Sequence, residues 1–213
     1  MLRIWGRTTS INVQKVMWAV AELGLAHERI DAGGVYGGLD TPAYRAMNPN
    51  GLVPTIDDDG AIVWESHAIV RYLAARYGVG SLCPEDWATR AVADQWMDWM
   101  ITTLNPGLSA VFWALVRTSP SKQDADQIAA AAAQAARPYG LLDAHLAKRP
   151  FVAGDSLTMG DIAIGPTLFR YFTMEIERPP LANVEAYYAR LQVRPAFRQH
   201  AMVSYESLRA RDA

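Results

Sequence analysis

The hydrophobic period changes twice within the first 30 residues, and this alternation most constrains the fold. LRIW (2–5) is typical of a short buried strand. Residues 10–24 then repeat apolar side chains at three- and four-residue spacing up to Gly24, which is typical of a helix. HERI (27–30) is a candidate second strand. The order strand, helix, strand predicts a small α/β unit.

A hairpin and a helix complete this unit. After a glycine-rich loop, VPTI (53–56) and AIVWE (61–65) flank an Asp-Gly turn, which predicts two antiparallel strands. Ser66 is expected to cap a helix that runs through Tyr77. We therefore expect an α/β domain over residues 1–79.

The remainder of the chain carries only helical periods. Asn105-Pro106-Gly107 is expected to kink or break the first long helix, because proline removes a backbone donor. We predict an all-helical domain over residues 87–213, with helices at 87–117, 122–147, 158–171, 183–192 and about 195–210.

Composition narrows the class of protein. The 213 residues carry a formal net charge of −2, which gives no electrostatic signal for nucleic acid or an anionic membrane. No apolar run reaches about 18 residues, and the start MLRIWGRTTS lacks the features of a signal peptide. The single cysteine, Cys83, fits a reducing compartment. We expect a cytoplasmic protein with neither nucleic acid nor membrane as a partner.

Two short segments suggest ligand binding. Pro54 at the start of a strand is compatible with a cis Val53-Pro54 bond, which would leave the Val53 backbone free for a ligand. A trans proline at a sheet edge is the alternative, since only about 5–6% of such bonds are cis. Glu65 and Ser66 begin a helix, where anions are favoured, although capping by Ser66 alone also explains the pair.

The motifs together resemble a known family. A turn with Ser10 precedes the first helix, and it is followed along the chain by NPNGLVP (48–54) and ESHAIVRYL (65–73). In SLTMGD (156–161), Thr158 and Asp161 form a capping box. In this order and spacing the chain resembles a cytosolic glutathione transferase of the serine type, similar to bacterial theta, beta or nu-like members. The resemblance covers the whole chain. It implies a thioredoxin-like N-terminal domain that binds glutathione and a helical domain that contributes the second-substrate pocket.

The resemblance also implies a glutathione site. The Val53 backbone, before a cis Pro54, would pair with the cysteinyl part, and Glu65 and Ser66 would hold the γ-glutamyl end. Leu52 stands where many members carry Gln or Lys, so that contact is lost unless Asn50 replaces it.

Two residues near the first helix are implied as catalytic. Ser10 has the spacing of the serine-type catalytic residue and Asn12 is its rival, whereas Trp5 leaves no catalytic tyrosine in the first strand. A hydroxyl that donates to sulfur would stabilise the nucleophilic thiolate. A hydrogen bond to a charged group contributes about 1.5–3 kcal/mol, or roughly one to two pKa units.

The second substrate is expected to be a small apolar electrophile. Helix 87–117 would line its pocket, although the same side chains could be core; the candidates are Thr9, Leu104, Leu108, Phe112 and Trp113. The resemblance implies a detoxifying transferase that forms a homodimer, with interface candidates Arg71, Tyr72, Trp96 and Met97.

Several alternatives stay open at this point. The same fold could serve a glutathione-dependent isomerase, a dehalogenase, a disulfide reductase or a non-catalytic scaffold. GDSL (154–157) matches a lipase nucleophile block at Ser156, but it lacks the adjacent strand that such a site needs. The four histidines lack metal-ligand spacing, so no metal is expected, and His67 is predicted to lie on the surface.

Overall fold

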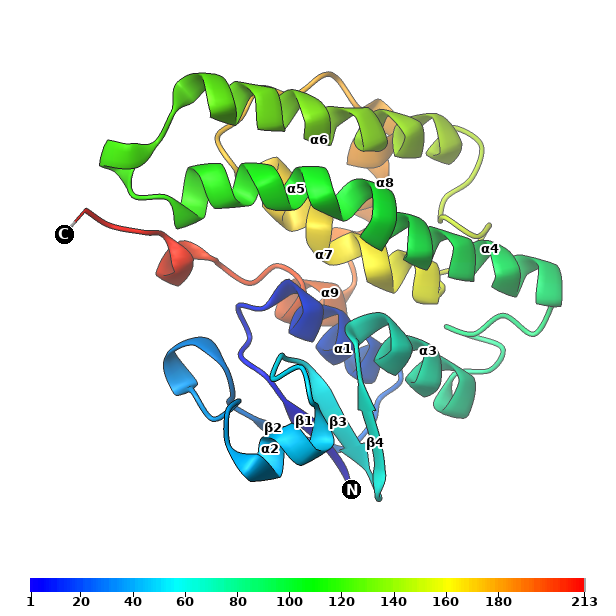
Figure 1. Ribbon diagram of the computed structural model, residues 1–213. Coiled ribbons are helices and arrows are strands. Elements are labelled where there is room, and N and C mark those ends of the chain that lie inside the picture. The colour runs from blue at the N-terminus through cyan, green and yellow to red at the C-terminus, as the bar shows by residue number, and fades with distance from the viewer. Residues whose placement is uncertain (213) are drawn as a thin grey trace.

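The computed structural model describes residues 1–212, and its N-terminal part is built on one mixed sheet (Figure 1). The strands are β1 (Leu2–Trp5), β2 (His27–Ile30), β3 (Thr55–Asp58) and β4 (Ala61–Trp64), in the order β2-β1-β3-β4. β1 pairs with β2 in parallel and with β3 antiparallel, and β3 pairs antiparallel with β4. The predicted strand–helix–strand unit and hairpin are therefore confirmed.

Helix α1 (Ile11–Glu22) lies between the sheet and the helical part of the chain (Figure 1). It packs against α3 (Ser66–Tyr77), α7 (Met159–Thr173) and α9 (Pro195–His200). Trp18 of α1 is fully buried, and a Cβ atom at Gly165 of α7 would lie 2.4 Å from its ring. This close approach requires glycine, so α1 and α7 fit together only where that side chain is missing.

The helical part covers one side of α1 and α3 (Figure 1). It contains α4 (Trp87–Trp99), a π-helical turn (Met100–Leu104), α5 (Asn105–Phe112), a second π-helical turn (Trp113–Arg117), α6 (Ala125–Leu146), α7, α8 (Ala182–Gln192) and α9. The short α2 (Pro42–Met47) belongs to the N-terminal part. The exact domain limits at 79 and 87 stay a prediction.

Two helix predictions need correction. The run Trp87–Arg117 is unbroken, because the π-helical turn directly before Pro106 rearranges the backbone bonding that the proline would disrupt. This run is long and apolar enough for a membrane span by length and composition only, and it packs against α6 and α7 of the same chain. The last predicted helix ends at His200 instead of 210, and a short 3₁₀ turn (Glu206–Leu208) follows.

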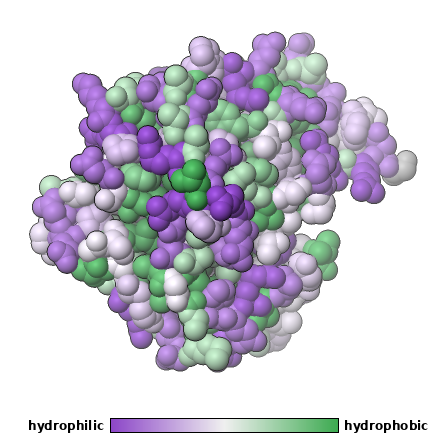
Figure 2. Space-filling model, turned by 180° about the vertical axis from the view of Figure 1, so that it is seen from behind, coloured by the Kyte–Doolittle hydropathy of each residue, from purple (hydrophilic) through white to green (hydrophobic). Residues whose placement is uncertain are grey.

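The surface seen from behind mixes hydrophilic and hydrophobic residues (Figure 2). Large exposed apolar side chains come from separate elements, among them Val35, Trp87, Trp113 and Val193. Trp96 and Met97, predicted at a subunit interface, are instead buried inside the chain. Packing against α7 explains this, since α4 presents them to the core.

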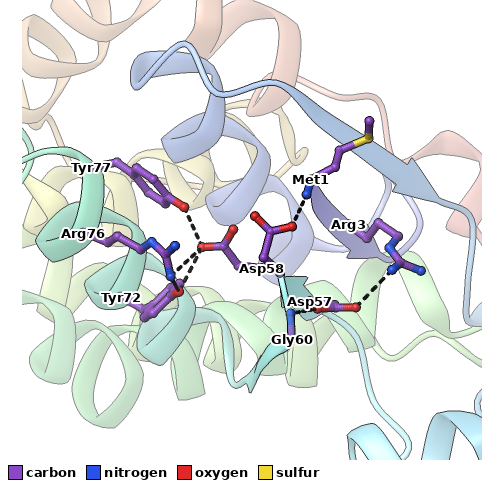
Figure 3. Close-up of polar contacts among 9 residues, drawn as sticks. Met1, Arg3, Asp57, Asp58, Gly60, Tyr72, Arg76 and Tyr77 are labelled. Carbon is purple, nitrogen blue, oxygen red and sulfur yellow. Dashed lines mark hydrogen bonds and ion pairs between the residues drawn. The ribbon is translucent and has the colours of Figure 1, made fainter.

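A buried carboxylate joins the sheet to α3 (Figure 3). Asp58 at the end of β3 is 3% exposed, and its Oδ2 accepts hydrogen bonds from Tyr72 (2.9 Å) and Tyr77 (2.7 Å). The Arg76 guanidinium lies 3.4 Å from the same oxygen. Three side chains of one helix therefore converge on one strand residue, which fixes α3 against the hairpin.

We expect Asp58→Asn to lower the free energy of unfolding by about 1–3 kcal/mol, because a charged acceptor is lost from a buried site. Chemical denaturation measures this. Asp59→Asn is the matched control: Asp59 is exposed and pairs with the Met1 amino group, and asparagine tolerates its left-handed backbone (φ 52°). Equal effects of the two substitutions would contradict a special role for Asp58.

Candidate functional site

The N-terminus of α1 lies between two cavities. The strand-side cavity is lined by Asn12, Asn48, Leu52, Val53, Pro54, Glu65 and Ser66. The helix-side cavity is lined by Arg7, Thr9, Ser10, Ile11, Asn105, Leu108, Ser109, Phe112, Trp113, Arg117, Arg170 and Leu208. Ser10 and Asn12, only two residues apart, thus face different cavities, and chemistry between two ligands would occur at this turn.

Ser10 is the N-cap residue of α1, with an extended backbone, and its side chain makes no capping hydrogen bond. Its carbonyl accepts from Gln14 N–H at 2.9 Å, as the first bond of the helix. Neither Thr8 nor Thr9 caps this helix, because it begins at Ile11. The Ser10 hydroxyl remains available to a ligand at the positive end of the helix.

The strand-side cavity is shaped by the segment before β3. The Val53-Pro54 peptide is cis, as predicted. The pairing of β3 begins at Thr55, so Val53 lies outside the sheet ladder. Asn48 Nδ2 donates to the Leu52 carbonyl at 2.9 Å and to Thr55 Oγ1 at 3.0 Å, which holds this segment against α2. The backbone of Val53 is therefore presented along the cavity by a fixed loop.

Glu65 and Ser66 enter the cavity at the start of α3. Glu65 occupies the N-cap position with φ 69°, an unusual conformation for a residue other than glycine. Ser66 is the first residue of the helix and is buried. The predicted capping role of Ser66 is wrong by one position, and no side-chain capping bond forms at this end. Strained backbone of this kind is concentrated at functional sites.

Not every predicted site residue lines a cavity. Asn50 does not; its N–H donates to Asn48 Oδ1 at 3.1 Å. Leu52 lines the strand-side cavity but is 61% exposed. Leu104 is fully buried and belongs to the core, whereas Thr9, Leu108, Phe112 and Trp113 line the helix-side cavity.

Four of the polar residues in these walls were not identified from the sequence as site residues. Asn48 holds the strand-side loop, and Arg7, Arg117 and Arg170 line the helix-side cavity, which was expected to be apolar. Arg170 Nη2 donates to the Thr9 carbonyl at 2.8 Å and so links α7 to the turn before Ser10. Asn48 lies within the motif NPNGLVP and Arg7 lies in the segment before Ser10, whereas Arg117 and Arg170 lie outside the quoted motifs.

A buried lysine forms a hydrogen bond to the first turn of α1. Lys15 Nζ, 1% exposed, donates to Asn12 Oδ1 at 3.1 Å and lies 3.1 Å from His67 Nε2 and 3.6 Å from Met100 Sδ. The prediction that His67 is a surface residue is wrong: it is buried, because α3 presents it to α1. Since the Asn12 oxygen is engaged by Lys15, the Asn12 amide group is left as a donor.

Burial is the main cause of the pKa shifts of Lys15 and His67. It lowers the pKa of Lys15 to about 7, with a further decrease from Arg170 and an opposing increase from Glu65. Burial and the neighbouring Lys15 and Arg71 lower the pKa of His67 to about 2, so the imidazole is neutral. The Nε2 atom of neutral His67 can therefore accept a hydrogen bond from Lys15 Nζ.

Two family models match the chain. One describes the N-terminal domain of glutathione S-transferases and covers residues 9–76; the other describes their C-terminal domain and covers residues 125–190.

Individual proteins are similar over nearly their whole length. Glutathione S-transferase GstB of Escherichia coli K12 is 42% identical, over 95% of this chain and 99% of its own. Glutathione S-transferase 3 of Zea mays is 30% identical, over 93% of this chain and 92% of its own. The glutathione-bound crystal structure of a theta class glutathione S-transferase from Xanthomonas axonopodis pv. citri is 46% identical, covers 95% of this chain and 98% of its own, and superposes with a TM-score of 0.91.

We expect stability to rise with pH in two windows, because the unfolded chain binds protons that the fold excludes. His67 causes the first rise, which extends up to about pH 6.5. Lys15 causes the second rise, between about pH 7 and pH 10.5. Lys15→Met should remove the second rise, whose slope is at most about 1.4 kcal/mol per pH unit. Denaturation at pH 7.5, 8.5 and 9.5 measures it. An unchanged slope in the variant would show that Lys15 titrates normally.

Proposed function

The chain belongs to the glutathione S-transferase family, and we propose that Ser10 activates the glutathione thiol for attack on an electrophile in the helix-side cavity. The enzyme is a transferase that uses glutathione as co-substrate. The observation that carries the proposed role of Ser10 is its hydroxyl, which is free of any capping bond and lies at the helix terminus between the two cavities.

The strand-side cavity offers groups that fit glutathione. The backbone of Val53 lies outside the ladder and can pair with the extended cysteinyl unit. The Glu65 carboxylate suits the α-amino group of the γ-glutamyl end. The Ser66 hydroxyl and the free N–H groups at the start of α3 suit its α-carboxylate. Leu52 can offer only its backbone, and Asn50 is not proposed as a ligand, since it lies outside the lining.

The mechanism needs a thiolate next to the electrophile. As the thiol proton leaves to solvent, the Ser10 hydroxyl donates a hydrogen bond to the sulfur, and the α1 terminus adds its positive potential. The Asn12 amide is the second proposed donor, oriented by Lys15. The sulfur then forms a bond to the electrophilic carbon, and the leaving group departs with its electron pair. Ser10 keeps its own proton throughout.

We expect Ser10→Ala to raise the pKa of enzyme-bound glutathione by about one to two units and to reduce kcat at neutral pH about 10- to 100-fold, because one charge-assisted hydrogen bond is lost. Thiolate absorbance against pH and the kcat profile measure this. Thr8→Ala is the matched control, since Thr8 loses the same hydroxyl outside both cavities. If only Asn12→Ala shifts the pKa, Asn12 is the thiol partner.

We expect Ser66→Ala to act on binding instead of ionisation. The dissociation constant of glutathione should rise roughly 10-fold, since one hydrogen bond to a carboxylate is lost. The pKa of the bound thiol should stay the same. Calorimetric titration measures the affinity, with Ser156→Ala in the exposed GDSL turn as control. An unaltered affinity would remove Ser66 from the site.

Glutathione-dependent isomerisation, dehalogenation and disulfide reduction would use the same thiolate, but no feature of this site favours them over conjugation. A non-catalytic scaffold is disfavoured by the pair of adjoining cavities around Ser10. We also propose a detoxifying role and a cytoplasmic location, and the free thiol of Cys83 supports the location.

We further propose a homodimer in which β4 and the neighbouring face of α3 meet the second copy. β4 is an edge strand, and it exposes Ile62 and Trp64 on one face. Arg71, an interface candidate, forms ion pairs with Asp94 and Asp98 of α4 in the same chain. Exposed apolar side chains on an edge strand favour association with another chain.

We expect Trp64→Arg to shift the enzyme from dimer to monomer, because it places a charge on the contact face. Sedimentation velocity measures the shift, and Trp87→Arg is the control, on a tryptophan of α4 that is more exposed (78%) than Trp64 (36%). A dimer that survives Trp64→Arg but not Trp87→Arg would move the interface away from β4.

A further inference from the structure

Three arginines from distant segments converge on the helix-side cavity. Arg7 follows β1, Arg117 ends the second π-helical turn, and Arg170 lies on α7. Within the part of the chain that the structure describes, no aspartate or glutamate lines this cavity. Among residues 1–212, none of the three guanidinium groups forms an ion pair with a carboxylate. The cavity therefore holds a concentration of positive charge that the side chains of residues 1–212 do not neutralise.

The existing partners of these arginines leave donors free. Arg170 donates to the Thr9 carbonyl and lies 4.4 Å from the ring centroid of Phe112. Arg117 donates to the Leu208 carbonyl at 3.3 Å and lies over Trp113. Nε of Arg7 is buried with no hydrogen-bond partner in the described chain. Carbonyls and rings orient Arg117 and Arg170 without cancelling their charge.

This arrangement is costly without an anion. Arg170 is 8% exposed, and burial lowers its pKa to about 10, with Tyr205 opposing the change and Arg7 and Arg117 adding to it. A buried charge that lacks a counter-ion is destabilising, and so is a set of like charges at close range. Such a set persists where a ligand supplies the opposite charge.

We propose that the helix-side cavity selects an electrophile that carries a carboxylate or a comparable anionic group. The inference rests on the proposed function, because it assigns the substrate class of the same site. The cavity volume is about 180 Å³, below the roughly 300–1,000 Å³ of pockets for drug-sized ligands, so the electrophile is small. Its carboxylate binds the arginines, and its reactive carbon lies toward Ser10.

The charges also explain why arginines suit this reaction. The glutathione sulfur is anionic when it attacks, and it repels a second anion at short range. The guanidinium groups offset that repulsion while the S–C bond forms. The C–X bond then breaks, and X leaves with the bonding electron pair as an anion. An apolar pocket could not bring two anions together in this way.

The glycyl carboxylate of glutathione is a second possible source of the same anionic group. If the arginines hold it, they determine affinity for glutathione and not the choice of electrophile. The two sources separate in kinetics: an electrophile contact changes the ratio between a charged and an uncharged electrophile, whereas a glutathione contact changes both equally and raises the KM for glutathione.

We test the proposal with 4-chloro-3-nitrobenzoate and its methyl ester, which lose chloride by the same substitution and differ in charge. For each we divide kcat/KM by the uncatalysed rate constant with glutathione, since the two differ in intrinsic reactivity. We expect the wild-type enzyme to favour the benzoate. Arg7→Gln and Arg117→Gln should each lower the benzoate-to-ester ratio roughly 10- to 100-fold, as expected for a lost charged hydrogen bond.

Two further variants sharpen the test. Arg117→Lys keeps the charge but not the forked geometry, so its ratio should lie between those of wild type and Arg117→Gln. Arg137→Gln removes the same charge from the exposed surface of α6, outside both cavities, and should leave the ratio unchanged. Thermal unfolding of each variant verifies that the fold is retained.

The outcomes separate this inference from the proposed function. Turnover of the ester with no preference for the benzoate overturns the inference and leaves the transferase function standing. Ratios that stay constant in both glutamine variants also overturn it, and a parallel increase in the KM for glutathione assigns the arginines to glutathione. Failure to conjugate either compound with glutathione contradicts both.

Discussion

The burial of α1 on both sides is the constraint on which the site depends. The helix lies between the sheet and the helical part (Figure 1), and it packs against α7, where Gly165 admits the ring of Trp18. Because the helix cannot shift between these layers, its first turn is fixed at the junction of the two parts. Ser10 then faces one cavity and Asn12 the other. A transferase that joins two substrates needs such a fixed point between two sites.

The same double burial creates the electrostatic support of the site. A helix with one wet face would place Lys15 in water, but here its ammonium is enclosed by Asn12, His67 and Met100. Because a buried ammonium group needs hydrogen-bond acceptors, the neutral His67 serves as one of them. The lysine in turn fixes the orientation of an amide at the active turn. In the proposed mechanism, packing and catalysis are therefore linked through Lys15.

Local patterns predicted the elements of the fold and the motif residues. The change of hydrophobic period marked β1 and α1, and the Asp-Gly turn marked the hairpin, because both signals depend on neighbours in sequence. His67 and Lys15 were missed because their burial results from contacts between helices, which a single period does not encode. The arginines were missed for the same reason: Arg7, Arg117 and Arg170 meet only when three segments have packed.

The charge of the site is opposite in sign to that of the chain. The protein carries a formal net charge of −2, yet the α1 terminus, Lys15 and three arginines surround the proposed position of the sulfur. Charges within a few ångströms in a poorly hydrated site outweigh a net charge distributed over a screened surface. The local potential therefore favours a thiolate on one side of Ser10 and an anionic electrophile on the other. Under the two proposals, one cationic environment serves both halves of the reaction, because the positive charge that favours the thiolate also favours an anionic electrophile.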